Sequence, residues 1–161
     1  MVVRYPYRMA TERDLRGAVR TLAVVARHLE RASGPLTLPQ YRVLVLVSSS
    51  PDRASRLAER ADVTKATLTG VIDSCVQHGW VERAQVVGDR RGVSLVVTAA
   101  GAKVLAEAEG AMTAWLASVL EQAGPTAPEE VASALATFGD GLAAARQAVA
   151  DMGAAVAVVG R

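Results

Sequence analysis

Arginine side chains gather in the middle third of this 161-residue chain. They are Arg53, Arg56, Arg60, Arg83, Arg90 and Arg91. A guanidinium group suits phosphate, because it keeps its charge at neutral pH and presents several N–H donors in one plane. The net charge is only +2, so the local clustering is more informative than the total. These residues predict a nucleic-acid surface in this part of the chain.

The other residues whose side chains could support catalysis or bind a metal do not form a recognisable catalytic or metal site. His28 and His78 have no cysteine or carboxylate companions at metal-ligand spacing, and no nucleophile with a base and an orienting acid can be recognised. We therefore expect neither an enzyme, nor a metal, nor a cofactor. The single cysteine, Cys75, cannot form an internal disulfide; its apolar neighbours favour a core residue over a redox sensor, which stays an alternative.

Two capped helices are expected before the arginine-rich region. Thr11 followed by Asp14 is typical of a helix N-terminus, and apolar residues then recur at helical spacing up to Ser33-Gly34-Pro35. Thr37 and Gln40 form a second capping pattern ahead of an apolar run. The β-branched residues from Val43 to Val47 are compatible with a strand as well, but the cap favours a helix.

A pair of short helices separated by a tight turn follows. The first covers residues 56–61 and the second begins after Thr64, with an apolar stripe formed by Leu68, Val71, Ile72, Cys75 and Val76. Gly79 supplies the left-handed conformation that ends the second helix. This arrangement predicts a helix-turn-helix.

A change from helical to alternating periodicity marks a hairpin. Residues 80–87 and 93–97 are prone to form strands, and the polar segment 88–92 between them predicts a loop with a basic tip. Two helices then follow, one capped by Thr98 and ending at Gly124-Pro125, the other beginning near Thr126. The last helix has a heptad-like apolar seam that requires a partner helix: Val131, Leu135, Phe138, Leu142, Ala145 and Val149.

In order and spacing, several segments resemble the MarR family of bacterial regulators. They are residues 36–44, 57–64, 79–83, Asp89-Arg90-Arg91, Leu95 and residues 98–101. The resemblance implies a mainly α fold with a small β-hairpin wing, which is a winged helix-turn-helix with long N- and C-terminal dimerisation helices. It divides the chain into an N-terminal dimerisation helix (1–36), a DNA-binding lobe (37–98) and C-terminal dimerisation helices (99–161), all within one compact domain.

The second helix of the pair would then enter the major groove of duplex DNA. Its outward face is small and polar, which permits close approach to base edges, although many relatives carry a larger side chain at Gly70. The predicted contacts on and around this helix are Arg53, Ser55, Arg56, Thr64, Lys65, Ala66, Thr67, Thr69, Gly70 and Arg83. A plain surface salt bridge is an equal alternative for Arg53, Ser55, Arg56 or Arg83.

The wing supplies the remaining predicted DNA contacts. The resemblance implies that Asp89 orients the tip while Arg90 or Arg91 reaches into the minor groove, where narrow A·T-rich stretches concentrate negative potential. A crevice for a small aromatic or anionic effector is also implied. Its candidate residues are His28, Tyr41, Arg42, Met112 and Trp115.

We therefore expect a homodimer that binds a pseudo-palindromic operator and regulates transcription, as a repressor released by a small molecule. A winged-helix protein-interaction module without DNA binding is the alternative from a different class. The first residues are charged and lack the apolar run of a secretory signal, and no apolar stretch approaches the roughly 20 residues of a membrane span. A cytoplasmic protein is therefore expected.

Overall fold

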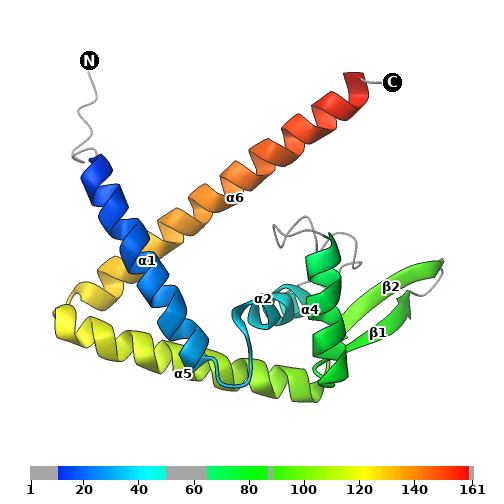
Figure 1. Ribbon diagram of the computed structural model, residues 1–161, viewed down its shortest axis with the longest axis horizontal. Helices are drawn as coiled ribbons and strands as arrows, with labels where there is room; N and C mark the ends of the chain where they lie inside the picture. Colours follow the sequence, from blue (N-terminus) through cyan, green and yellow to red (C-terminus); the bar gives the residue numbers. More distant parts are fainter. Residues whose placement is uncertain (1–10, 50–64, 87–88, 160–161) are drawn as a thin grey trace. The chain divides into compact units, whose positions relative to one another are not determined.

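The computed structural model describes residues 11–49, 65–86 and 89–159, and within these it leaves the side chains of residues 65, 85–86, 89–93, 150 and 152–159 undescribed (Figure 1). The chain forms two compact units, one up to Trp115 and the other from Leu116 onward. The first unit holds the second helix of the predicted pair and the hairpin. The division into a DNA-binding lobe and dimerisation helices stays a prediction.

Helix α1 (Glu12–Ala32) begins with the predicted cap. The Thr11 hydroxyl accepts a hydrogen bond from the Asp14 amide at 3.2 Å, and the Asp14 carboxylate accepts one from the Thr11 amide at 2.9 Å. The Thr11 hydroxyl also donates to the Asp14 carboxylate at 2.7 Å, and this bond, together with the one from the Thr11 amide, holds the pKa of Asp14 below its ordinary value. The helix ends at Ser33, and Gly34 follows with a φ of 66°. None of its own residues is buried.

Helix α2 (Leu38–Ser49) resolves the ambiguity of its β-branched run in favour of a helix. Gln40 Oε1 accepts hydrogen bonds from the Thr37 amide at 2.9 Å and from the Thr37 hydroxyl at 3.0 Å, which fixes the first turn. Val43, Leu44 and Val47 are buried. A cap that satisfies free amides outweighs the weak strand preference of these side chains.

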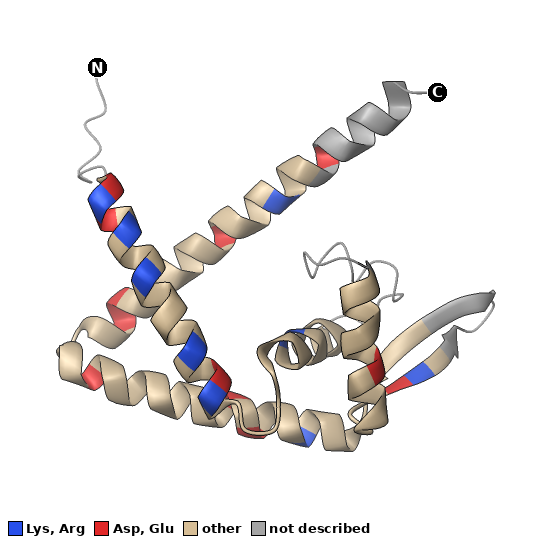
Figure 2. Cartoon of the chain, in the orientation of Figure 1, with Lys and Arg blue, Asp and Glu red and all other residues tan. Residues whose placement is uncertain are grey.

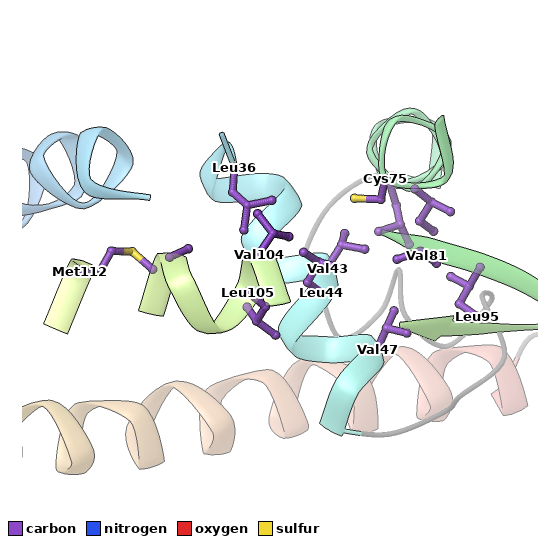
Figure 3. Packing of buried hydrophobic residues seen from close by; sticks show 13 residues of the cluster. Leu36, Val43, Leu44, Val47, Cys75, Val81, Leu95, Val104, Leu105 and Met112 are labelled. Atoms are coloured by element: carbon purple, nitrogen blue, oxygen red, sulfur yellow. The ribbon is translucent and has the colours of Figure 1, made fainter. Parts of the chain in front are cut away.

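Helix α4 (Lys65–Gln77) packs on α2 through the predicted stripe. Leu68, Ile72 and Cys75 are buried, and Gly79 ends the helix with a φ of 71°. Figure 3 shows Cys75 and Val81 on the side of α4 and the hairpin, with Leu36, Val43 and Val104 converging between the helices. The core is one continuous cluster: Leu36, Val43, Leu44, Val47, Leu68, Ile72, Cys75, Val81, Leu95, Val104, Leu105, Ala108 and Met112.

The hairpin consists of β1 (Val81–Val86) and β2 (Asp89–Val97), which pair antiparallel. The prediction of a polar loop at 88–92 was wrong in extent, because β2 begins at Asp89, opposite Val86. The next pair joins Gln85 to Val93, so the segment 90–92 lies between two consecutive pairs as a bulge. Polar residues can form a strand here because the ladder uses backbone N–H and C=O groups.

A junction of backbone contacts fixes the hairpin to its neighbouring helices. The Trp80 amide donates to the Cys75 carbonyl at 2.9 Å, and the Thr98 amide donates to the Trp80 carbonyl at 3.0 Å. The Thr98 hydroxyl donates to the Gly79 carbonyl at 2.6 Å and accepts from the Gly101 amide at 3.0 Å, which caps α5 (Ala99–Ala123). One threonine thereby joins the end of α4 to the start of α5.

Gly101 owes its identity to this junction. A Cβ atom at this position would lie 2.0 Å from the Trp80 carbonyl oxygen and 3.0 Å from Val97 Cγ1. Only a residue without a side chain allows α5 to approach the start of β1 so closely.

The second unit contains the end of α5 and helix α6 (Ala127–Val159). Gly124 has a φ of 127° between the two helices, and the Glu130 amide donates to the Thr126 carbonyl at 3.1 Å. The predicted seam is exposed on α6, including Leu135, Phe138 and Leu142. In the described part of the chain, no helix has an apolar window long enough to cross a membrane.

Candidate nucleic-acid interface

The outward face of α4 is the centre of the candidate site. Ala66, Thr67, Thr69 and Gly70 are exposed, as predicted, while the opposite side of the helix enters the core. Asp73 and Gln77 continue the exposed face toward the end of the helix. Small side chains on a firmly packed helix leave room for another molecule to approach the helix backbone.

Gln40 fixes the position of α4 on α2. Its Nε2 donates to Ser74 Oγ at 2.9 Å, while its Oε1 accepts the two bonds from Thr37. Gln40 is buried, so this bond forms where water cannot compete freely. The sequence indicates the capping role of Gln40, but nothing in it reveals a partner 34 positions further along the chain.

Arg83 extends the site to the base of the hairpin. Its guanidinium forms an ion pair with Asp73 of α4, and both side chains are about half exposed. The ion pair connects α4 to β1. A phosphate contact and a surface salt bridge were both predicted as possible for Arg83. The structure shows the salt bridge.

Most of the predicted cations cannot be placed. Arg53, Ser55, Arg56 and Thr64 lie outside the described residues, as does the first helix of the predicted pair. Lys65 begins α4, and Asp89, Arg90 and Arg91 belong to β2, but their side chains are not described. Figure 2 shows that lysine and arginine in the described part are concentrated on α1.

Cys75 lies on the core side of α4. Its side chain is fully buried, and this burial raises the pKa of its thiol to about 11. Oxidation proceeds through the thiolate, which is scarce at neutral pH under these conditions. The environment of Cys75 therefore disfavours the redox-sensing alternative.

The five candidate effector residues come from α1, α2 and α5. His28 of α1 and Trp115 of α5 stack with ring centroids 5.2 Å apart, and the Tyr41 hydroxyl lies 3.5 Å from Glu109 Oε1. Burial and the Glu109 carboxylate raise the pKa of Tyr41. Arg42 is exposed on α2, whereas Met112 is a core residue, as its helical spacing from Val104, Leu105 and Ala108 indicates.

A groove that the sequence did not reveal lies beside α4. It is open, has a volume of about 470 Å³, and is bounded by Glu30 of α1, Pro39 of α2, and Thr67, Gly70 and Val71 of α4. One wall is therefore shared with the exposed face of the helix. No group of histidine, cysteine, aspartate or glutamate residues in the described part of the chain could hold a metal ion.

The fold and this site define a winged-helix protein. Residues 35–92 match the sequence model of the MarR family. A segment of 65 residues is 34% identical to the HTH-type transcriptional repressor YetL of Bacillus subtilis (strain 168). That match covers 38% of this chain and 39% of YetL, so it spans about two fifths of the relative's length.

Solved structures extend the similarity over most of the chain. The MarR family protein Rv2887 of Mycobacterium tuberculosis, in complex with salicylic acid, is 28% identical, with a TM-score of 0.64 over 80% of this chain and 96% of the other. The MarR family transcriptional regulator Sco3205 of Streptomyces coelicolor, in complex with DNA, is 24% identical. Its TM-score is 0.63, and the match covers 84% of this chain and 91% of Sco3205. The chain is therefore similar to MarR family proteins, in sequence over residues 35–92 and in fold over most of its length.

Proposed function

We propose that this protein is a dimeric transcriptional regulator that binds duplex DNA sequence-specifically, with α4 in the major groove. The exposed face of α4 carries this proposal: Ala66, Thr67, Thr69 and Gly70 point away from a core that holds the opposite side of the same helix. A helix of this size fits the major groove, where each base pair presents a distinct donor and acceptor pattern. The threonine methyl groups can contact thymine methyls.

The wing would contact the adjoining minor groove. Arg90 and Arg91 lie in the bulge of β2, between the pairs Gln85–Val93 and Val86–Asp89. A bulge can redirect side chains away from the regular alternation of a strand. An arginine in a narrow minor groove meets enhanced negative potential. The DNA complex of Sco3205 supports an interaction with DNA in a protein of this fold.

The dimer would form through the outer helices. Leu15, Val19 and Leu22 are exposed along α1, and Leu135 and Phe138 are exposed along α6. Apolar stripes of this kind on long helices are typical of surfaces that a partner helix covers. Two copies would present two recognition helices to the halves of a pseudo-palindromic operator.

The protein would act as a repressor that a small molecule releases from DNA. YetL is named a transcriptional repressor, and Rv2887 was crystallised with salicylic acid. A ligand changes DNA affinity only through its different affinity for the DNA-binding and non-binding states. The stacked pair His28 and Trp115 is the most suitable place for an aromatic effector among the five predicted residues.

A salt titration of DNA binding tests the proposal. Fluorescence anisotropy with duplexes from the region upstream of the protein's own gene would give the affinity and its dependence on salt. We expect affinity to fall steeply as salt rises, because phosphate contacts release counterions. Replacing both Arg90 and Arg91 with alanine should lower affinity by about tenfold or more and flatten the salt dependence.

A control variant removes the same charge elsewhere. Arg16→Ala with Lys103→Ala changes two exposed cations on α1 and α5, and should leave affinity within about twofold. DNA binding that is insensitive to salt, or equal losses in the two double variants, would contradict the proposed role of the wing. Such a result would favour a protein-interaction module.

A further inference from the structure

One side of α1 carries a row of exposed arginines. Arg13, Arg20 and Arg27 are seven positions apart, and Arg31 follows four positions later. At about 100° and 1.5 Å per residue, these four fall within an arc of roughly 40° and extend over roughly 27 Å of the helix axis. Figure 2 shows basic residues recurring along this helix. We call the row the arginine face of α1.

The arginine face keeps its charge within the part of the chain that the structure describes. Among the arginines of α1, only Arg16 forms an ion pair there, with Glu12 at 2.6 Å, and Arg16 lies outside the row. The acidic residues of the helix, which are Glu12, Asp14 and Glu30, all fall outside the arc of the row. The arginine face therefore presents one sign of charge to solvent.

Neither folding nor packing of the chain requires this charge. Like charges one turn apart, such as Arg27 and Arg31, oppose helix formation, and no residue of α1 is buried. The proposed dimer contact uses another side of the helix, because Leu15 and Leu22 lie roughly 140–180° around the axis from the row. A partner helix that covers these leucines leaves the arginine face uncovered.

The spacing of the arginine face suits a long polyanion. Its neighbouring members are roughly 6–10 Å apart along the axis, so a single small anion cannot meet all of them. Duplex DNA carries one negative charge per roughly 1.7 Å of its axis, and guanidinium groups bind phosphate well. An anionic membrane fits less well, because a helix that inserts its apolar side would point this row away from the headgroups.

We propose that the arginine face of α1 is a second, sequence-independent DNA surface that binds the phosphate backbone outside the winged helix-turn-helix. Phosphate contacts position a protein on DNA without reading its bases. The inference goes beyond the proposed function, because it requires neither α4 nor the wing. The arginine face would hold the protein on DNA of any sequence.

Salt titration with a random-sequence duplex tests the arginine face. Arg13→Gln, Arg20→Gln and Arg27→Gln would be combined in one variant, because glutamine has a helix propensity similar to that of arginine. Losing three phosphate contacts should reduce the slope of log affinity against log salt by about two to three, and should lower affinity about tenfold or more at low salt. Fluorescence anisotropy measures both quantities. An unchanged slope would overturn the proposal.

A matched variant removes the same net charge elsewhere. Arg16→Gln, Lys103→Gln and Arg146→Gln replace three exposed cations outside the row, and together should change the slope by less than about one. Equal effects of the two triple variants would overturn the proposal, since net charge alone would then attract DNA. Lysine at the three row positions should restore most of the affinity, because lysine also binds phosphate. Failure of lysine to do so would show that the row acts through the structure of α1, and would refute a DNA surface.

A comparison of two duplexes separates the arginine face from the proposed function. The triple glutamine variant of the row should weaken binding to the upstream duplex and to the random duplex by the same factor. A larger loss on the upstream duplex would contradict a sequence-independent role. If the wild-type protein shows no preference for the upstream duplex, the proposed function fails, and the random-duplex titration still decides the arginine face.

Vesicles of phosphatidylglycerol present the competing partner. The wild-type protein should not sediment with them at a salt concentration where it binds the random duplex. Sedimentation that the triple glutamine variant loses, together with an unchanged salt slope for DNA, would assign the arginine face to a membrane surface and overturn the proposal.

Discussion

The core of the winged helix and the long outer helices use apolar residues in opposite ways. Leu44 and Leu95 in the core are 0% and 1% exposed, whereas Leu15 on α1 and Phe138 on α6 are 58% and 53% exposed. Neither α1 nor the described part of α6 has a buried residue. The core is complete within one chain, while the outer helices have apolar faces that one chain leaves uncovered. Helical periodicity alone does not show what covers such a face.

Charges on the seam of α6 should produce the largest effect. Leu135→Asp with Phe138→Asp should raise the dimer dissociation constant by about a thousandfold or more. Four exposed apolar side chains that the proposed dimer would bury are lost, and charges are placed between the helices. Analytical ultracentrifugation would measure the change. Ala136→Asp with Ala143→Asp, on the opposite side of the helix, is the matched control. A variant that stays dimeric would show that another surface joins the subunits.

The core should respond to a single methyl group. Gly101→Ala places a Cβ atom 2.0 Å from the Trp80 carbonyl oxygen, which should reduce the free energy of unfolding by about 3 kcal/mol. Gly110→Ala lies on the same helix with nothing within 4 Å, and should raise stability by up to about 1 kcal/mol. Urea unfolding of the two variants gives the comparison. A similar gain in both would mean that the junction adapts easily.

Local signals account for the parts of the fold that were predicted correctly. Thr11, Thr37 and Thr98 cap the helices they were expected to cap, and Gly34 and Gly79 have the positive φ values of helix ends. Each of these signals depends on residues within four positions of one another. Helix boundaries could therefore be predicted from sequence over most of the described chain.

Contacts between distant residues were the part that sequence could not supply. The bond from Gln40 to Ser74, the groove beside Gly70 and the close approach at Gly101 all depend on how separate elements pack. The sequence indicates Gly101 only as part of a family resemblance. Its close approach to the Trp80 carbonyl could not be predicted, because Trp80 lies 21 positions earlier in the chain. The sequence predicted the second strand from residue 93, whereas β2 begins at Asp89. Periodicity depends on the pattern of side chains and does not show which backbone groups pair.

Burial of Cys75 should make the stability of the core depend on alkaline pH. The pKa of the folded thiol is about 11, above its ordinary value of 9.0, so the unfolded chain loses its proton first as pH rises. This contribution is fully present below pH 9 and should decline by about 2 kcal/mol as the pH rises toward 11. Denaturation at a series of pH values measures it.

Cys75→Ala provides the control for that dependence. The variant should be less stable at every pH because it leaves a cavity, but its stability should fall less steeply above pH 9. Tyr41, whose pKa is also raised, contributes equally to both proteins and cancels in the difference. Identical slopes would indicate that the thiol is hydrated in solution and does not belong to the dry core.

The ion pair between Asp73 and Arg83 should have the smallest effect, because both side chains are about half exposed. A double-mutant cycle with Asp73→Asn and Arg83→Gln should give a coupling energy below about 1 kcal/mol that decreases with added salt. DNA affinity is the more informative measurement. If Arg83 leaves Asp73 to bind a phosphate, Asp73→Asn should strengthen DNA binding while Arg83→Gln weakens it. If the pair instead holds the hairpin against α4, both variants should weaken DNA binding alike, and the wing would depend on the core for its orientation.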